Sequence, residues 1–136
     1  MLTDATGIPL AVRVTAANRN DVTQLLPLIQ QIPPVRGRRG RPRRRPNQLV
    51  ADRGYDSAAH RQALRTLGIR PVIAKRRVEH GSGLGRWRWV IERSIAWLHQ
   101  YRRLAVRWEY RADIHHGFLT LACCLICWRF LKRCAA

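Results

Sequence analysis

An arginine-rich run near the middle of the chain limits what this sequence can fold into. Residues 33–46 read PPVRGRRGRPRRRP, with seven arginines and Val35 as the only apolar side chain apart from the prolines. Such a segment cannot pack into a core, so we predict an exposed, mobile loop. Like-charge runs often serve as interaction segments, and these arginines suit contact with phosphates. The alternative is a merely solvated loop.

The whole chain shares this bias toward positive charge. Its 136 residues carry 26 Lys and Arg against 8 Asp and Glu, which gives a net charge of +18, and only Lys75 and Lys132 are lysines. This balance favours a polyanionic partner, with nucleic acid first. A basic face for anionic lipid and an arginine bias inherited from GC-rich coding DNA stay open. The length suits one domain with its own core.

The termini and the apolar stretches bear on localisation. No basic stretch leads into a long apolar segment at the N-terminus, so we expect a cytoplasmic protein without a signal peptide. The longest apolar stretch, residues 117–128, is shorter than the ~18 to 20 residues that span a bilayer. It predicts a buried helix and no membrane association.

The cysteines all lie in that last helix, as Cys123, Cys124, Cys127 and Cys134. A zinc site needs four converging ligands, and neither a second cysteine pair nor a close histidine completes one here. We interpret the cysteines as small apolar core residues in a reducing compartment.

Two elements are predicted before the arginine-rich run. Residues 8–14 read as a strand that leaves a tight turn at Gly7, with residues 1–3 as its hairpin partner. A helix follows Asn20 or Asp21, and Pro27 should bend or shorten it. Its apolar residues stand at helical spacing: Val22, Leu25, Leu26, Ile29 and Ile32.

After the run, the order strand, helix, strand predicts a parallel pair. We expect strands at residues 48–51 and 69–74 around a helix at 57–67, with Ser57 as its cap and Gly68 as its stop. Residues 75–85 form a second basic, glycine-rich loop. Two further helices are expected, near residues 86–99 and 113–132. The fold class is α/β.

An aspartate stands where the first of these strands ends. In an α/β sheet, ligands and chemistry gather at the carboxyl ends of parallel strands, and Asp52 stands at such an end. An isolated Asp beside Gly54 would be read as a turn former. The helix at residues 86–99 adds a second carboxylate, Glu92.

That helix has two faces of interest. We predict that Ile91, Ile95 and Leu98 form one apolar stripe toward the sheet. Another face carries Arg88, Glu92 and His99. One interpretation is a surface ion pair between Arg88 and Glu92. The other is that Glu92 faces Asp52 and that the two carboxylates hold divalent metal, with Mg²⁺ as the best fit.

Three segments together resemble a known family. The stretch from HGSGLGRWRWVIERSIAWLHQY to the last helix, with GIPLAVRVTAANRNDVTQLLPLI and VADRGYDS, resembles the C-terminal part of bacterial insertion-sequence transposases of the DDE class. The resemblance covers nearly the whole chain. It implies an RNase H-like mixed sheet with flanking helices, and an Asp, Asp, Glu triad that uses Mg²⁺ or Mn²⁺ to cut DNA and join it to a target.

The resemblance assigns roles by position. Asp52 matches the second aspartate and Glu92 the glutamate, both as catalytic residues and metal ligands. Arg88 fits the family's arginine, while Gly85 and His99 stand where the family has tyrosine and lysine. Trp87, Trp89 and Tyr55 are candidates to stack on a flipped base, although core packing is the first expectation for the tryptophans. The candidate DNA-binding residues are Arg88, His99, Arg38, Arg39, Arg41, Arg43, Arg44, Arg45, Arg102, Arg103 and Arg107.

The family's first aspartate and its strand have no counterpart in this sequence, and Asp4 falls on a hairpin turn instead. We therefore expect a fragment, residues 1–136 of a catalytic domain, that is inactive alone. It is either a relic or a downstream reading frame whose partner is the product of an upstream frame. Double-stranded DNA, at element ends and target, is the expected substrate, and a homodimer on DNA is left open. A non-catalytic basic nucleic-acid-binding protein is the alternative; a stand-alone nuclease would need a third acid.

Overall fold

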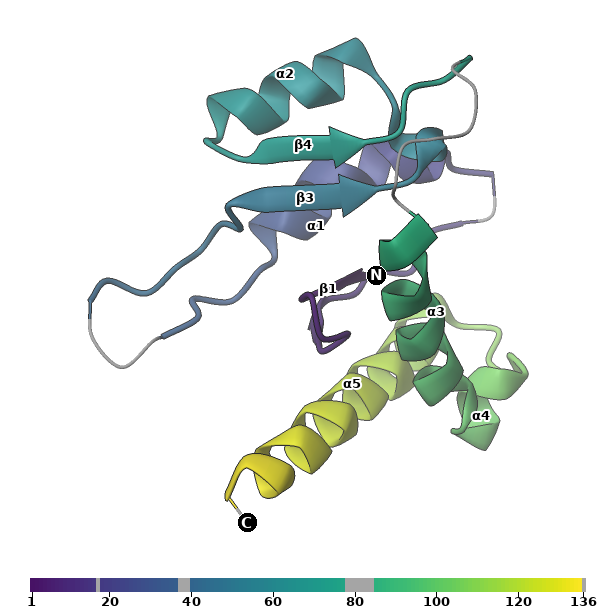
Figure 1. Cartoon of the computed structure of the whole chain (residues 1–136). Helices are drawn as coiled ribbons and strands as arrows, with labels where there is room; N and C mark the ends of the chain where they lie inside the picture. Colours follow the sequence, from purple (N-terminus) through teal and green to yellow (C-terminus); the bar gives the residue numbers. More distant parts are fainter. Residues whose placement is uncertain (17, 37–39, 78–84, 136) are drawn as a thin grey trace. The chain divides into compact units, whose positions relative to one another are not determined.

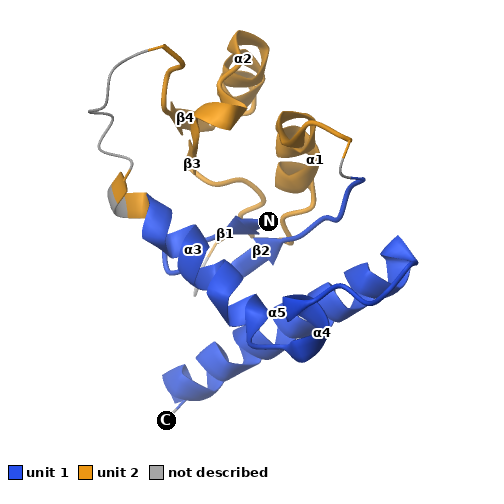
Figure 2. Cartoon of the chain, turned by 90° about the vertical axis from the view of Figure 1, so that its right-hand side faces the viewer, with its two compact units in different colours: residues 1–16, 88–136 blue, residues 17–87 orange. Residues whose placement is uncertain are grey.

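The computed structural model describes residues 1–16, 18–36, 40–77 and 85–135. Helices and short strands follow one another along the chain, as expected for the α/β class (Figure 1). The chain divides into two compact units, residues 1–16 with 88–136 and residues 17–87 (Figure 2). Each unit has buried apolar residues of its own.

A β-hairpin begins the first unit. β1 (Leu2–Thr3) pairs antiparallel with β2 (Pro9–Ala11), which confirms the predicted strand and its partner, although β2 is shorter than residues 8–14. Asp4 holds the turn, because its Oδ1 accepts two backbone N–H groups at 2.9 Å each. Gly7 has a φ of +87°, a conformation open to glycine at little cost, so the predicted turn is confirmed.

A buried serine joins α3 (Gly85–His99) to this hairpin. Ser94 has 0% exposure, and its Oγ lies 2.8 Å from the carbonyl oxygen of Gly7 and 2.9 Å from that of Val90. The hydroxyl therefore satisfies a backbone carbonyl of the turn that would otherwise be buried without a partner. A larger apolar side chain at this position would keep the turn away from the helix.

The predicted apolar stripe on α3 is wrong at one of its residues. Ile95 is 42% exposed, whereas Leu98 is 7% exposed. The buried line runs instead through Val90, Ser94 and Leu98, at i, i+4 and i+8. Apolar side chains lie along two neighbouring rows on the surface of α3. The small polar Ser94 lies in the buried row and contacts the hairpin turn.

The core of the first unit lies between α3 and α5 (Ala112–Ala135), with the short α4 (Arg102–Ala105) connecting them. Trp97 and Phe130 meet edge to face with ring centroids 5.4 Å apart. This arrangement adds to the area that both rings bury. The buried residues of the cluster are Leu98, Ala122, Cys123 and Ile126.

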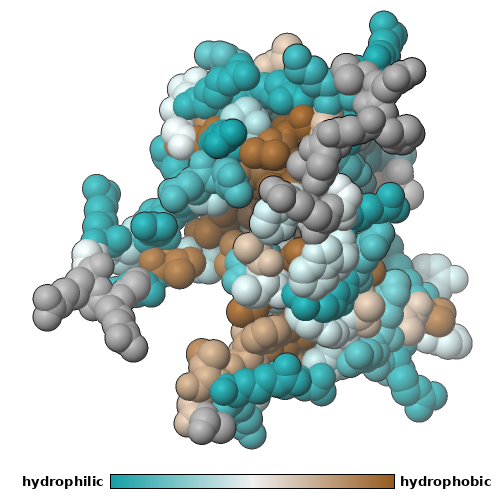
Figure 3. Space-filling model, viewed as in Figure 1, coloured by the Kyte–Doolittle hydropathy of each residue, from teal (hydrophilic) through white to brown (hydrophobic). Residues whose placement is uncertain are grey.

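The prediction of a buried helix at residues 117–128 is wrong in part, because much of the surface of α5 is exposed. Only three residues of α5 are buried, and Figure 3 shows apolar side chains at the surface along this helix. In addition, α5 is long and apolar enough to cross a membrane by length and composition, a test that core helices of soluble proteins also pass. The helix is thus longer than the apolar stretch of residues 117–128 on which the sequence expectation rested. The large exposed residues are Ile114, Leu121, Leu125, Trp128 and Leu131.

The second unit begins with a short helical segment. A 3-10 turn, η1 (Asp21–Gln24), leads into α1 (Leu25–Gln30). The side chain of Asn20 caps η1 by accepting the N–H of Val22 at 3.2 Å. The α-helix is shorter than the apolar spacing indicates. Pro27 lies in its first turn, where the missing N–H costs least, so the predicted shortening is confirmed.

The predicted strand, helix, strand order is confirmed. β3 (Gln48–Ala51) pairs parallel with β4 (Arg70–Ile73) around α2 (Ala58–Thr66), in the register Gln48↔Arg70 to Ala51↔Ile73. Gly68, with a φ of +75°, ends α2 as predicted. Ser57 occupies the N-cap position, but its side chain makes no capping hydrogen bond. α1 and α2 lie side by side (Figure 2).

The described strands form two separate two-stranded sheets, β1–β2 and β3–β4, rather than one mixed sheet. Each sheet belongs to a different unit. The second unit buries its own apolar residues around β3 and β4, and these are Leu25, Leu28, Ile29, Ile32, Leu49, Leu64, Ile69, Ile73 and Ala74.

Candidate metal and nucleic-acid sites

Asp52 follows β3 directly and is exposed, at the predicted strand end. Its Oδ1 accepts the N–H of Gly54 at 2.8 Å, so this carboxylate caps the 3-10 turn η2 (Arg53–Tyr55). A Cβ on Gly54 would lie 3.0 Å from that oxygen, which favours glycine there. The other oxygen, Oδ2, accepts no hydrogen bond from the described part of the chain. Asp52 is therefore a turn former that keeps one oxygen open.

A second aspartate holds this turn in place. The Oδ1 of Asp56 lies 2.7 Å from Nη2 of Arg61, and its Oδ2 accepts the backbone N–H of Arg76 at 2.8 Å. The backbone hydrogen bond from Arg76 and then the side-chain hydrogen bond from Arg61 hold the pKa of Asp56 below its ordinary value. These residues were not predicted from the sequence, since the spacing of Asp56 on a loop and Arg61 on a helix is not distinctive.

Tyr55 lies in the same turn and is half-buried. Burial raises the pKa of its hydroxyl, and the negative charges of Asp21 and Asp52 raise it further. The ring therefore stays neutral over the physiological range and can donate a hydrogen bond.

Glu92 belongs to the first unit, whereas Asp52 belongs to the second. Its Oε1 accepts from Nε of Arg88 at 2.7 Å, and the two side chains are 58% and 78% exposed. The predicted pair one helical turn apart is thus present. His99 is exposed at the end of α3. An exposed pair of this kind contributes little to stability.

The described residues contain no group of three or more His, Cys, Asp or Glu side chains that could hold a metal ion by themselves. The cysteines divide into two kinds. Cys123 is buried, and burial raises the pKa of its thiol to about 11; burial also raises the pKa of Cys127. Cys124 and Cys134 are exposed, so the core interpretation is wrong for these two.

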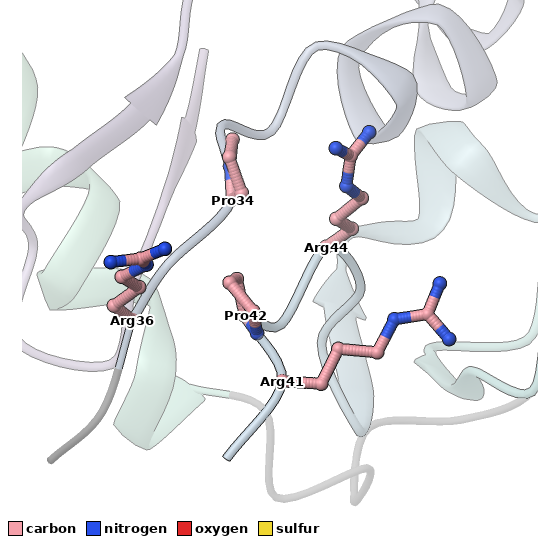
Figure 4. Close-up of a pocket in the computed structure, with 5 residues that line it drawn as sticks. All are labelled: Pro34, Arg36, Arg41, Pro42 and Arg44. Atoms are coloured by element: carbon pink, nitrogen blue, oxygen red, sulfur yellow. The ribbon is translucent and has the colours of Figure 1, made fainter. Parts of the chain in front are cut away.

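The predicted exposed segment at residues 33–46 is confirmed as mostly exposed over its described parts, 33–36 and 40–46, which we call the arginine hairpin. It is more ordered than a loose loop, because Val35 and Arg43 exchange both backbone hydrogen bonds at 2.8 Å. A hollow of about 370 Å³ lies beside the bridge (Figure 4), lined by Pro34, Arg36, Arg41, Pro42 and Arg44. Arg38 and Arg39 lie outside the described residues.

Most arginine side chains described in this hairpin have no hydrogen-bond partner among the described residues. Among the described residues, no acceptor receives a hydrogen bond from the guanidinium groups of Arg36, Arg41, Arg43 or Arg44. Arg45 differs, because its Nη1 donates to the carbonyl oxygen of Leu67 at 3.3 Å. Unpaired, exposed guanidinium groups on one hairpin are available to an anion.

Among the candidate arginines after α3, two form hydrogen bonds within the protein and one is exposed without a partner among the described residues. Arg103 donates to Oε1 of Glu109 at 2.9 Å, and Arg107 donates to the carbonyl oxygen of Glu109 at 3.2 Å. Burial raises the pKa of Glu109, but the hydrogen bonds that its carboxylate accepts and the positive charges of Arg103 and His115 together outweigh burial and hold the pKa below its ordinary value. Arg102 is exposed and has no partner among the described residues.

Core packing is the wrong expectation for three tryptophans. Trp89, Trp108 and Trp128 are 50%, 70% and 56% exposed. Trp97 packs in the core. The guanidinium carbon of Arg93 lies 4.3 Å from the ring centroid of Trp89 and 4.9 Å from that of Trp97, which is cation–π geometry.

Comparison with known proteins identifies the family. The family described as "Transposase DDE domain" matches residues 1–127. This chain therefore belongs to the DDE transposases.

A curated relative agrees with this family. The chain is 66% identical over 133 residues to a protein of Burkholderia cepacia described as a putative transposase for insertion sequence element IS402. The match covers 98% of this chain and 63% of the relative, so the chain spans less than two thirds of that protein. No solved structure matches.

Proposed function

We propose that this chain is part of an enzyme that cuts and rejoins DNA during transposition, with an RNase H-like catalytic domain. The observation that carries the proposal is the placing of Asp52. It follows a parallel strand in a member of the DDE family and keeps one carboxylate oxygen open. Ligands of α/β sheets gather at this edge.

The donor atoms fit a hard divalent cation. Asp52 and Glu92 offer exposed carboxylate oxygens, which Mg²⁺ and Mn²⁺ prefer over nitrogen or sulfur. One oxygen of each carboxylate accepts a hydrogen bond within the protein, from the Gly54 N–H in Asp52 and from Arg88 in Glu92. The other oxygen remains for an ion. When bound, such ions activate an attacking oxygen and stabilise the leaving oxygen of a phosphodiester. We assign the third acid of the triad to the part of the relative that this chain does not match.

Double-stranded DNA, at element ends and target, is the proposed substrate. The net charge of +18 and the unpaired arginines of the hairpin support phosphate contacts, with Arg41 and Arg44 at the hollow and the exposed Arg43 beside them as candidates. Arg88, His99 and Arg102 are exposed in the first unit and are further candidates for phosphate contacts. Arg45, Arg103 and Arg107 contribute while they also hold the protein together.

The setting of the enzyme follows from the same proposal. We place the enzyme in the bacterial cytoplasm, where chromosomal DNA is its proposed substrate. The product of an upstream reading frame is the proposed protein partner. A homodimer on two element ends is the arrangement that pairs them for joining.

A second candidate is a non-catalytic protein that binds nucleic acid. The unpaired guanidinium groups of the arginine hairpin favour it, because phosphate binding needs neither Asp52 nor Glu92. Metal distinguishes the two functions. A nuclease-like core responds to Mg²⁺ or Mn²⁺ through its acids, whereas a simple binder responds only to salt.

The test is a chimera that joins this chain to the part of the Burkholderia cepacia relative that it does not match. With DNA carrying the ends of the element, we expect Mg²⁺-dependent strand cleavage and joining. Asp52→Asn and Glu92→Gln should each abolish cleavage while DNA binding is kept. The control is Asp113→Asn, which removes an exposed carboxylate paired with Arg111. Cleavage that survives both Asp52→Asn and Glu92→Gln would contradict the assignment.

A further inference from the structure

We propose that Arg76, together with Asp56, is a positioning residue that fixes the Asp52 carboxylate for metal binding. This inference rests on the metal role of Asp52 proposed above. It concerns residues beyond the triad, on the loop that follows β4 and in the turn that follows Asp52.

The guanidinium group of Arg76 closes over the turn that Asp52 begins. Its Nε donates to the carbonyl oxygen of Arg53 at 3.1 Å, and its Nη2 donates to that of Gly54 at 2.9 Å. These residues are 23 and 22 positions away in sequence. The same turn presents the Gly54 N–H to Oδ1 of Asp52. The Arg53 carbonyl and the Gly54 N–H belong to one planar peptide group, so the Arg76 Nε that holds this carbonyl also fixes the direction of that N–H.

Asp56 ties Arg76 to the sheet. Its Oδ2 accepts the backbone N–H of Arg76 at 2.8 Å, and its Oδ1 accepts from Nε of Arg61 at 2.8 Å. Arg61 also donates to the carbonyl oxygen of Ile73, the last residue of β4, at 2.8 Å. The side chains of Arg61 and Asp56 are only 16% and 17% exposed. The ends of β3 and β4 are thus linked by a closed set of charged hydrogen bonds.

Such a set differs from an ordinary surface ion pair. The Arg88–Glu92 ion pair links two exposed side chains on one helix. By contrast, the side chains of Arg61, Arg76 and Asp56 bind three backbone carbonyls and one backbone N–H across two loops. Hydrogen bonds to charged groups are the stronger kind, and residues that orient a metal ligand often alter metal affinity by 10- to 100-fold. The inferred effect is the orientation of Asp52 Oδ2.

The experiment uses the full chain labelled with ¹⁵N and titrated with Mn²⁺, which broadens the amide signals nearest to its site. We expect broadening at Gly54 and Tyr55. In Arg76→Gln, the Mn²⁺ concentration that half-broadens these signals should rise about tenfold. The matched control is Arg77→Gln, at an adjacent exposed arginine with the same change of charge, and it should shift the value by less than about twofold.

The sign of this effect separates positioning from charge. Removing a positive guanidinium group near a carboxylate strengthens binding of a divalent cation there, because the guanidinium group and the cation repel each other. Weaker Mn²⁺ binding in Arg76→Gln therefore cannot arise from charge alone. If Arg76→Gln fails to fold, Arg76→Lys keeps the charge but not both carbonyl hydrogen bonds, and a several-fold weaker affinity is expected there. Equal affinities in the Arg76 and Arg77 variants would overturn the inference.

A separate readout distinguishes failure of the proposed function. If Mn²⁺ leaves the signals of the unsubstituted chain unchanged, the metal role of Asp52 is wrong. The hydrogen-exchange rate of the Gly54 amide then tests the positioning role directly. A faster rate in Arg76→Gln than in Arg77→Gln supports it, and equal rates overturn it.

Discussion

The hydroxyl oxygen of Ser94 lies 2.8 Å from the carbonyl oxygen of Gly7, and a Cβ added to Gly7 would lie 2.9 Å from that hydroxyl. The turn of the N-terminal hairpin and the middle of α3 are thus in direct contact, 87 residues apart in sequence. The contact leaves no room for a side chain at residue 7. It makes the hairpin turn a part of the first unit's core.

Gly7→Ala should destabilise the protein. Alanine would have to adopt the positive φ of +87° and would press on Ser94, at a cost of about 1 to 3 kcal/mol in the free energy of unfolding. Urea unfolding measures this cost. Gly117→Ala is the control, because nothing lies within 4 Å of its Cβ and helical alanine is better than glycine by roughly 0.5 to 1 kcal/mol. Equal midpoints for the two variants would contradict the contact.

Truncations on α3 should show which of its faces is buried. Leu98→Ala removes a side chain that is 7% exposed and should cost about 2 to 5 kcal/mol of unfolding free energy. Ile95→Ala, at a residue that is 42% exposed, should cost about 1 kcal/mol or less. Thermal or urea unfolding compares the two variants. A greater loss of stability for Ile95→Ala would restore the stripe predicted from sequence.

Asp56 should make stability depend on pH in the acid range. Its pKa is lowered in the folded state, so its contribution is present above the ordinary aspartate pKa and is lost as pH falls through the lower, folded value. Asp56→Asn should therefore unfold at lower urea than the parent chain at pH 7. The gap should shrink as pH falls below about 4. A gap that stays constant between pH 7 and pH 3 would argue against the hydrogen bonds to Arg61 and Arg76.

The arginine hairpin should account for a distinct part of DNA affinity. Replacing Arg36, Arg41 and Arg44 by Gln should weaken binding to a duplex and lower the slope of log K against log salt by about 0.9 for each phosphate that is no longer neutralised. Fluorescence anisotropy of a labelled duplex at several salt concentrations gives both values. The control removes the same charge at three exposed arginines without side-chain partners among the described residues, which are Arg13, Arg65 and Arg70. Similar decreases in affinity for both triple variants would indicate a diffuse charge effect.

The chain alone should be inactive in strand transfer. Under the proposed assignment, Asp52 and Glu92 are two of three metal-binding acids, and two carboxylates hold an ion more weakly than three. The purified 136-residue chain, incubated with Mg²⁺ and DNA carrying element ends, should give no joined product. Detectable Mg²⁺-dependent joining would overturn this expectation and call for a third acid within the chain.

Local signals in the sequence determined the elements of the second unit. The order strand, helix, strand between Gln48 and Ile73 was predictable because a short apolar run, a glycine stop and a helical repeat each act within a few residues. The place of Asp52 at the end of β3 followed from the same signals. The exposed character of the arginine hairpin followed from charge and proline alone.

Tertiary structure decided what distant residues do to one another. Ser94 is buried on α3 and donates to the Gly7 carbonyl, and no pattern within the helix records the need for that donor. Arg76 holds the turn after Asp52 through hydrogen bonds to residues 22 and 23 positions away, and the apolar surface of α5 is exposed despite its composition. Periodicity describes one element at a time, whereas burial and hydrogen bonding depend on which other element is brought against it.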